Sequence, residues 1–353
     1  MTKMRTTPVL PVLPVLLALF ALGACSVGGT TGGGPSDKQV VVATHDSWAM
    51  SKNVLAQFTR QTGYTVQIEK NGDAGELTNK LVLTKGDPIA DLTYGIDNTF
   101  GSRAVDAGIL TGYRPGDIPA AAGSFALAGG RDLLTPVDYS DVCVNVDDSW
   151  FARHNLAPPR TLSDLTKPKY RDLFVTEGAS TSSTGLAFLF ATIAQYGSGW
   201  PAYWRQLMAN GTKVDAGWED AWGVDYTAGG GDGDRPIVTS YSSSPPDTIP
   251  KGATKPTTSA LLGTCFRQVE YVGVLKGARN PAGAKAFERF MLGRAFQSAL
   301  PDEMYVYPVD TSLPLPSDWA KYAAPASHPR SLSPSTITKN RDAWLRTWSD
   351  ITS

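Results

Sequence analysis

Apolar runs alternate with amphipathic stretches along the first third of the chain. Residues 39–44 (QVVVAT) form the near-continuous apolar run that is typical of a buried parallel strand. The next stretch carries apolar residues at helical spacing after Ser51, a candidate N-cap. The same order of strand and helix repeats over residues 65–85 and 91–109. Repeated strand–helix units build a mostly parallel sheet covered by helices, so the sequence predicts an α/β fold.

Polar and aromatic side chains follow two of the predicted strands. His45, Asp46 and Trp48 come directly after the first strand, and Asp97 follows the third. Because ligands of such sheets bind beyond the carboxyl ends of the strands, these four residues are candidate ligand contacts. Asn98 is the predicted N-cap of the helix that comes next.

Two later segments, residues 137–146 and 266–275, alternate wholly or in part between apolar and polar side chains. This pattern predicts extended strands, and both segments are suited to crossing between two lobes. Removal of a 24-residue leader from the 353-residue chain leaves 329 residues, which is long enough for two lobes that each have a core.

Cys143 and Cys265 are the two cysteines outside the N-terminal region. In an oxidising compartment two cysteines either form one disulfide or stay as two buried thiols, and their number alone favours neither. Because both lie on or beside the crossing segments, we predict that they are bridged.

The N-terminal 24 residues have the pattern of a secretory signal peptide. Lys3 and Arg5 precede an apolar run over residues 9–24, which ends in small residues immediately before Cys25. Small residues before a cysteine resemble the lipobox of bacterial lipoproteins, which implies that Cys25 becomes the lipidated first residue; an ordinary signal peptide with an incidental cysteine is the alternative. The Gly-, Ser- and Thr-rich stretch that follows predicts a flexible tether, so residues 25–38 are read as anchor and tether.

A buried helix is predicted over residues 185–196, which are apolar nearly all round. Its start carries Ser182, Ser183 and Gly185. Free backbone N–H groups and hydroxyls at a helix start form an anion site that a phosphate fits, whereas simple capping is the other interpretation.

Aromatic residues are concentrated between residues 217 and 245. Trp218 and Trp222 are four residues apart and share a face if this stretch is helical, although Trp222 is equally suited to a core position. After a Gly-rich break, a short predicted strand delivers Tyr241 and a group of serines to its end. Flat rings with nearby carboxylates and hydroxyls suit a flat, cationic small molecule.

Charge and histidine content exclude several classes of function. The net charge is −1 and no run of Lys or Arg occurs, so nothing indicates a nucleic-acid partner. Ser182 and Ser183 lack a Gly-x-Ser-x-Gly context, and no histidine is placed as their base. The chain is therefore predicted not to be an enzyme, with a secreted hydrolase as a disfavoured alternative.

Six segments together resemble a known family, the thiamine-binding subunits of ABC importers, within the type II periplasmic-binding-protein fold. They extend from the first predicted strand almost to the C-terminus. The segments are residues 44–48 (THDSW), 94–98 (YGIDN), 181–186 (TSSTGL), 217–223 (GWEDAWG), 240–245 (SYSSSP) and 305–309 (YVYPV).

The resemblance implies a role for each candidate residue. Trp218 and Tyr241 would contact the rings of thiamine, and the turn over residues 182–185 would hold its hydroxyethyl or phosphate end. Asp46 and Asp97 would line the opposite lobe. A thiazolium carries a fixed positive charge, which ring faces and carboxylates in a desolvated cleft favour.

Two positions depart from the family pattern. His45 stands where the pattern has Tyr, and Tyr305 stands where it has Trp, so a ring is kept at both. The preference among thiamine, its phosphates and a pyrimidine precursor is therefore left open. Iron-binding relatives tend to use adjacent tyrosines, which this chain lacks, so neither a metal nor a cofactor is expected.

The resemblance also implies an architecture and a cellular role. Two α/β lobes joined by a hinge are expected, with residues 39–139 and 266–300 in lobe 1, residues 140–265 and 301–353 in lobe 2, and the ligand cleft between them. The expected role is that of a monomeric, extracytoplasmic lipoprotein, anchored to the cell membrane, that delivers thiamine or a phosphate ester to an ABC permease. A receptor for another small charged solute, such as a polyamine or a thiamine precursor, is the alternative.

Overall fold

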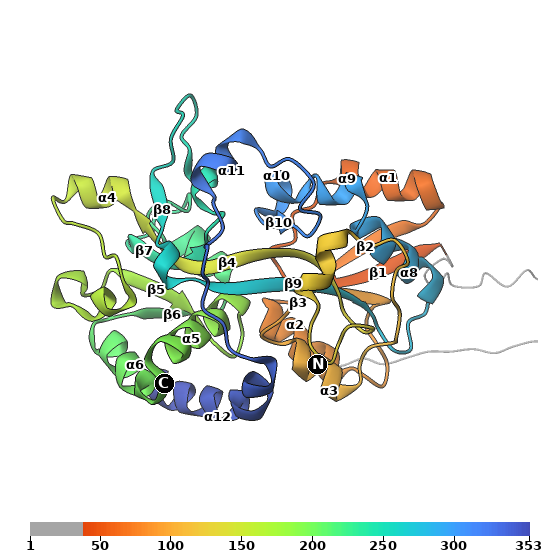
Figure 1. The fold of residues 1–353 in the computed structure, drawn as a ribbon, viewed down its shortest axis with the longest axis horizontal. Coiled ribbons are helices and arrows are strands. Elements are labelled where there is room, and N and C mark those ends of the chain that lie inside the picture. Colours follow the sequence, from red (N-terminus) through yellow and green to blue (C-terminus); the bar gives the residue numbers. More distant parts are fainter. Residues whose placement is uncertain (1–37) are drawn as a thin grey trace, which may run out of the picture. The chain divides into compact units, whose positions relative to one another are not determined.

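A mixed ten-stranded sheet runs through residues 38–353, the part of the chain that the computed structural model describes (Figure 1). The strand order is β2-β1-β3-β9-β4-β7-β5-β6, and β8 and β10 pair with β4. The strands are β1 (Gln39–Thr44), β2 (Thr65–Lys70), β3 (Leu92–Asp97), β4 (Thr135–Asp147), β5 (Phe174–Glu177), β6 (Lys213–Asp215), β7 (Ile237–Tyr241), β8 (Thr258–Ala260), β9 (Phe266–Val274) and β10 (Tyr307–Pro308).

Helices cover the sheet on both sides of its centre (Figure 1). They are α1 (Lys52–Thr62), α2 (Ala74–Leu83), α3 (Gly101–Ala107), α4 (Asp148–Arg153), α5 (Ser183–Tyr196), α6 (Trp200–Ala209), α7 (Trp218–Asp220), α8 (Pro281–Met291), α9 (Arg294–Gln297), α10 (Leu300–Met304), α11 (Ser317–Tyr322) and α12 (Pro334–Thr352).

The strand–helix repeat of the first third folds as the pattern predicts. β1 pairs in parallel with β2 and β3, so the α/β prediction is confirmed for this region. Ser51 is the N-cap of α1 and accepts a hydrogen bond from the Val54 N–H. The helix ends at Gly63, whose φ of 75° is favourable only without a side chain.

β4 and β9 lie side by side and join the two sides of the sheet (Figure 1). β9 pairs antiparallel with β3 on one side and with β4 on the other, while β4 continues into antiparallel pairing with β7. Both predicted crossing segments are therefore strands. The lobe boundaries assigned from the sequence remain a prediction.

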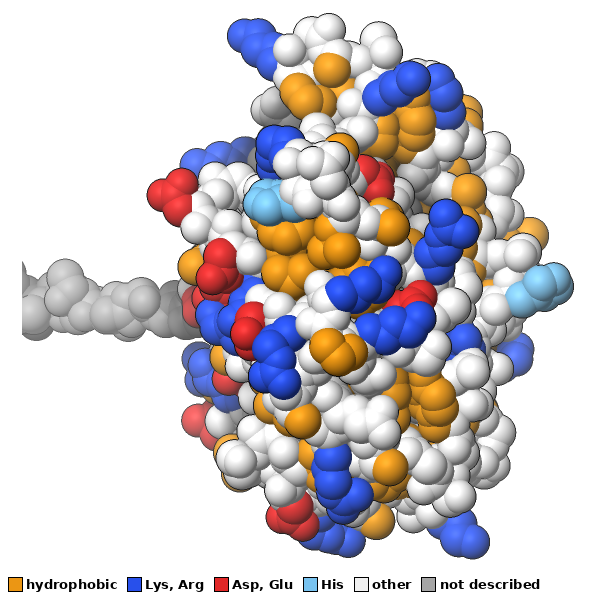
Figure 2. Space-filling view, turned by 90° about the vertical axis from the view of Figure 1, so that its left-hand side faces the viewer, with side chains coloured by type: hydrophobic (Ala, Val, Ile, Leu, Met, Phe, Trp, Pro, Cys, Tyr) orange, Lys and Arg blue, Asp and Glu red, His pale blue; other side chains and the backbone are white. Residues whose placement is uncertain are grey.

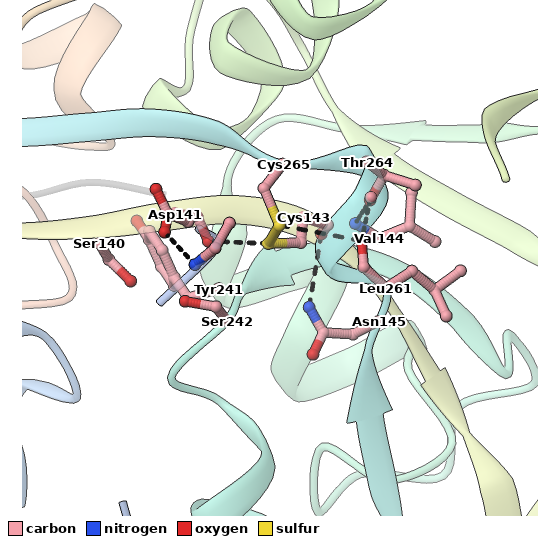
Figure 3. The surroundings of a disulfide bond; sticks show 12 residues. Ser140, Asp141, Cys143, Val144, Asn145, Tyr241, Ser242, Leu261, Thr264 and Cys265 are labelled. Atoms are coloured by element: carbon pink, nitrogen blue, oxygen red, sulfur yellow. Dashed lines mark hydrogen bonds between the residues drawn. A yellow bond between two sulfur atoms is a disulfide. The ribbon is translucent and has the colours of Figure 1, made fainter. Parts of the chain in front are cut away.

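The structure contains the predicted disulfide between Cys143 and Cys265 (Figure 3). Cys143 lies within β4, and Cys265 directly precedes β9. Both residues are buried. The bond joins the two crossing strands at the end of β9 that faces the β7–β5–β6 side of the sheet.

Helix α5 is the central buried helix of the second part of the sheet. All its residues from Ser183 to Ile193 are buried, as the nearly uniform apolar pattern predicted. Trp204 of α6 packs edge-on against Phe188 and against Trp348 of α12, so the C-terminal helix closes this core.

The prediction that Asn98 caps α3 is wrong. The Asp97 carboxylate accepts the N–H groups of Thr99 and Phe100 instead. The Asn98 side chain pairs with the backbone of β9, donating to the Arg267 carbonyl and accepting from the Val269 N–H. A contact with a strand far along the sequence thus replaces the local capping that the pattern favoured.

The Trp218–Trp222 stretch is helical only in part. The α-helical turn of α7 passes directly into a π-helical turn over Ala221–Asp225. Single π turns are common at functional sites.

Lys and Arg side chains are scattered among hydrophobic and acidic ones on the face drawn in Figure 2. On this face the Lys and Arg side chains are more numerous than the acidic ones and are spread out instead of forming one cluster.

The predicted signal peptide (residues 1–24), the lipidation at Cys25 and all but the last residue of the tether lie outside the described residues. Within residues 38–353, no helix has the length and apolar character needed to cross a membrane.

Candidate ligand-binding site

A cavity of about 200 Å³ opens among segments that are far apart in the sequence. It is bounded by the loop after β1, the start of α2, the starts of α5 and α7, the end of β7, the middle of β9 and the residues around the end of α10. The lining residues are His45, Ser47, Ala49, Asp73, Ser183, Trp218, Glu219, Trp222, Tyr241, Ser244, Asp247, Glu270, Glu303, Met304, Tyr305 and Val306.

Three aromatic rings form one wall of the cavity. The indoles of Trp218 and Trp222 are stacked, with centroids 5.6 Å apart and an interplanar angle of 14°. The Tyr241 ring is tilted and lies 6.1 Å from Trp218. The Trp218 indole N–H donates to Ser240 Oγ at 2.9 Å, which fixes the orientation of this half-buried ring. The two rings singled out from the sequence are thus neighbours in the cavity wall.

His45 and Glu270 form a buried ion pair on the cavity floor. His45 Nε2 lies 3.3 Å from Glu270 Oε1. Burial by itself disfavours the charged imidazolium, but the Glu270 carboxylate more than offsets burial and raises the pKa of His45. Burial by itself would also raise the pKa of Glu270, but His45 and hydrogen bonds from neighbouring groups hold that pKa below its ordinary value. The floor therefore carries one positive and one negative group that compensate each other.

A second buried acid lies directly behind Glu270. Asp138 of β4 is the register partner of Glu270 across the β4–β9 pair. The Tyr94 hydroxyl oxygen lies 2.7 Å from Asp138 Oδ2 and 2.9 Å from Glu270 Oε2. Burial, and then the charge of Glu270, raises the pKa of Asp138 well above its ordinary range. Asp138 is therefore a neutral acid, and the Tyr94 hydroxyl, which has one proton to donate, can serve the Glu270 carboxylate.

Asp73 joins segments on opposite sides of the cavity. Its carboxylate caps α2 by accepting the Ala74 N–H at 2.6 Å, and it also accepts the Trp218 N–H at 3.0 Å. Beside it, the Gly75 N–H donates to the Thr181 carbonyl at 2.9 Å. A Cβ atom at Gly75 would lie 2.6 Å from two carbonyl oxygens of residues 180 and 181, so this contact requires glycine.

The segment around α10 closes another side of the cavity onto the loop after β1. Glu303 accepts the Ser51 N–H at 2.6 Å, and Met304 Sδ lies 3.1 Å from the Ala49 N atom. Tyr305 adopts a left-handed backbone conformation (φ 55°) and lines the cavity with its exposed ring. Partial burial and then the nearby Asp247 carboxylate raise the pKa of Tyr305 to about 12, so its hydroxyl stays protonated.

Five of the residues predicted from the sequence line the cavity, and all five contribute a ring or a hydroxyl. They are His45, Ser183, Trp218, Tyr241 and Tyr305.

Three other predicted residues serve the surrounding structure. Asp46 is exposed and accepts the Gly72 N–H at 2.9 Å. Trp48 is buried in the core beside β1, where it packs edge-on against Tyr94. Asp97 is fully buried at the start of α3, and burial raises its pKa to about 6 in spite of its hydrogen bond with Thr99. None of the three is among the residues of the described chain that line the cavity.

The predicted turn at the start of α5 reaches the cavity only through Ser183. Ser182 is fully buried, and its hydroxyl is paired with that of Thr184 at 2.9 Å. A Cβ atom at Gly185 would lie 2.5 Å from the Glu177 carbonyl oxygen, so glycine lets the helix approach β5 closely. The Glu177 carboxyl is fully buried, and burial raises its pKa well above the ordinary value.

Several acidic lining residues were missed in the sequence: Asp73, Glu219, Asp247, Glu270 and Glu303. Asp73 had a usable signal because it follows the second predicted strand, at a carboxyl strand end like those already chosen. Glu270 had none, because its place on the cavity floor depends on the register of β9 between β3 and β4.

Residues 87–329 match the family described as bacterial extracellular solute-binding protein. The chain belongs to this family. Its extracellular character agrees with the predicted extracytoplasmic location, and its members bind solutes without chemical turnover, which confirms the prediction that the chain is not an enzyme.

The chain is also similar to individual members of known function. The thiamine-binding periplasmic protein of Brucella melitensis is 26% identical over 322 residues, which cover 89% of this chain and 92% of the relative. The Escherichia coli protein of the same name is 25% identical over 315 residues, covering 88% and 92%.

A solved structure described as a periplasmic thiamin binding protein superposes with a TM-score of 0.76. It is 24% identical in sequence, and the match covers 89% of this chain and 96% of that one. The chain therefore has the type II periplasmic-binding-protein fold that was expected from the sequence.

Proposed function

We propose that this solute-binding protein captures thiamine or a thiamine phosphate ester in the cavity and delivers it to an ABC importer. The observation that carries the proposal is the wall of three rings, from Trp218, Trp222 and Tyr241, facing a cavity rich in carboxylates. The similarity along nearly the whole chain to thiamine-binding periplasmic proteins supports the same ligand.

The chemistry of the cavity suits a planar cation. A cation placed over an indole or phenol face gains about 0.5–2 kcal/mol, with the larger values at desolvated sites. The carboxylates of Asp73, Glu219 and Asp247 add an attraction to positive charge that is stronger here than in bulk water. Ser183 and Ser244 provide hydroxyls for the polar substituents of the ligand.

The way the sheet is joined supports capture by closure of two lobes. β4 and β9 are the strands that connect its two sides, which suits them to act as the hinge. The Asp73–Trp218 and Gly75–Thr181 hydrogen bonds would form on closure, because each pair joins the two predicted lobes. A ligand that contacts both sides stabilises the closed state by its differential affinity.

We further propose that the protein acts as a monomer held at the cell membrane by lipid on Cys25. The support is the signal-peptide pattern and the small residues that precede this cysteine. Mass spectrometry of the protein purified from membranes would show a diacyl or triacyl addition at Cys25, and an unmodified N-terminus would contradict the anchor.

Titration calorimetry of the purified domain with thiamine tests the ligand directly, with quenching of tryptophan fluorescence as a second signal. We expect saturable one-site binding that spermidine does not displace. Absence of both heat and quenching, or displacement by spermidine at equal concentration, would contradict the proposed ligand.

A further inference from the structure

Helices α1, α8 and α9 lie together beside β1 and β2 (Figure 1). Phe58 of α1 packs against Phe287 and Phe290 of α8, so the two helices share one core. On the outer side, a groove of about 720 Å³ runs between the end of α1 and the junction of α8 with α9, and Arg289 and Arg294 line it. The three helices therefore form one continuous face, and its groove is lined by two guanidinium groups.

The charged side chains of this face have one sign. Helices α1 and α9 contain no acidic residue. The one acid of α8, Glu288, is buried and accepts a hydrogen bond from Thr135 Oγ1 at 2.6 Å. Burial raises the pKa of Glu288 to about 8, so this group is mostly uncharged at neutral pH. The cations of the three helices and of the turn before α8 are Lys52, Arg60, Lys276, Arg279, Lys285, Arg289 and Arg294.

The contacts of these cations leave most of their charge uncompensated. Arg289 Nη1 donates to the Tyr113 hydroxyl at 2.7 Å, and Lys285 Nζ lies 5.2 Å from the centroid of the same ring. A neutral ring positions the two cations without neutralising them. Arg279 lies 3.8 Å from Asp87, but both side chains are largely exposed, and such a pair contributes little.

The described part of the chain begins beside this face. The Lys38 carbonyl accepts the N–H of Thr65, which follows α1, at 2.8 Å. Asn280, the N-cap of α8, donates to the next carbonyl along the chain at 2.9 Å. A Gly-rich chain as long as residues 26–37 has a root-mean-square span of about 20 Å. Lipid on Cys25 would therefore hold this face within reach of the bilayer.

We propose that this basic face binds the anionic headgroups of phospholipids, so that the anchored protein lies on the membrane with α1, α8 and α9 toward the bilayer. The inference rests on the lipid anchor of the proposed function. Each cation near an anionic lipid surface strengthens binding about fivefold, and the effect falls off within a Debye length. Because the net charge of the chain is −1, the attraction depends on where the cations lie and not on a surplus of them.

Acetylation of lysines by a water-soluble reagent, read by mass spectrometry, measures which face is covered. The lipidated protein is purified from membranes and placed in vesicles of phosphatidylcholine, either alone or with about 30% phosphatidylglycerol. Lys276 and Lys285 should react at least about threefold more slowly on the anionic vesicles, and about 0.5 M salt should remove the difference.

Lys169 is the matched control within the same molecule. Like Lys285 it lies over a tyrosine ring, with its Nζ 4.6 Å from the centroid of Tyr170. It precedes β5, which is near the opposite end of the sheet from β1 and β2. Its rate of acetylation should be the same on neutral and anionic vesicles.

Two double variants separate the position of the charges from their number. Arg60→Glu combined with Arg294→Glu reverses two charges of the face, leaves both reporter lysines in place and should abolish their slower reaction. Arg205→Glu combined with Arg346→Glu makes the same change of net charge at exposed sites of α6 and α12, and the slower reaction should persist. Both variants should keep the Tm and thiamine affinity of the wild type, because none of these arginines lines the cavity.

The outcomes distinguish the membrane-facing surface from the anchor. Slower reaction of Lys276 and Lys285 on anionic vesicles, lost in the first variant and kept in the second, supports the inference. Equal reaction on both kinds of vesicle, equal slowing of Lys169, or loss of the effect in both variants overturns it and leaves the anchor and thiamine binding in place. Protein that washes off neutral vesicles overturns the lipid anchor itself, and this inference with it.

Discussion

Replacement of Trp218 by alanine tests the aromatic wall most directly. The indole stacks on Trp222, lies beside Tyr241 and is oriented by its hydrogen bond to Ser240. If its face contacts a desolvated cation, the loss of that contact costs about 2 kcal/mol, which corresponds to about a 30-fold increase in Kd. Calorimetry with thiamine measures this change.

The same substitution affects stability, so the two effects have to be measured separately. Loss of one aromatic pair and one hydrogen bond is expected to lower the free energy of unfolding by about 2 kcal/mol. In a protein of this size that corresponds to a decrease in Tm of a few degrees, which calorimetric unfolding without ligand would detect. The ligand-binding measurement therefore belongs well below that temperature.

Two further variants complete this test. Trp218→Phe keeps a ring but loses the indole N–H, and an intermediate increase in Kd of about three- to tenfold is expected. Trp150→Ala is the matched control, because Trp150 is also half-buried and stacked on a ring, that of His154, yet does not line the cavity. Thiamine affinity within twofold of the wild type in Trp218→Ala would refute the assignment of this ring to the ligand.

Three other perturbations have expected outcomes. Gly75→Ala places a Cβ atom against the backbone carbonyls of residues 180 and 181. Thiamine should therefore bind at least about tenfold more weakly, while the Tm of the free protein changes little. An unchanged affinity for thiamine would show that this contact is absent from the liganded state. Joint replacement of Cys143 and Cys265 by serine opens a loop of 122 residues and should lower the free energy of unfolding by up to about 5 kcal/mol. Guanidinium unfolding measures this difference. If the variant and the wild type have the same free energy of unfolding under oxidising as well as reducing conditions, the bridged pair is contradicted. Because the pKa of His45 is raised in the folded state, its charge contributes stability that is fully present below pH 6.5 and is lost as pH rises through the folded pKa. The Tm of the wild type should therefore fall relative to that of His45→Gln as pH rises from 6.5. Parallel curves of Tm against pH for the two proteins would contradict the ion pair.

Local patterns in the sequence predicted the strands and the rings because both depend on neighbouring residues. The apolar run at residues 39–44 and the alternation at residues 137–146 each determine one strand whatever its partners are. Trp218 and Tyr241 were found through their own chemistry, as large rings next to glycine and serine. For these features the periodicity of the chain is sufficient.

The acidic half of the site was missed because its position depends on pairing between distant strands. Glu270 lies in the middle of β9, and which of its neighbours face the cavity is determined by the register with β3 and β4, including an irregularity next to Gly95. Asp97 was predicted to contact the ligand because it ends a strand, but its carboxylate is used by the first turn that follows. Strand ends thus predict where a site lies better than which side chain faces it.

The buried cluster of His45, Glu270, Tyr94 and Asp138 is better explained by the ligand than by stability. Removal of such groups from water costs several kcal/mol per ion, and a buried ion pair seldom returns more than that. The cluster nevertheless gives the cavity floor an ionised carboxylate, that of Glu270, which His45 and the Tyr94 hydroxyl stabilise. Two adjacent buried acids do not both ionise, and here Asp138 is the one that keeps its proton. Glu270 lies on β9 and Asp138 on β4, so this charge is anchored to the two strands that join the sides of the sheet. A cation bound against this carboxylate would lie next to the two strands proposed as the hinge.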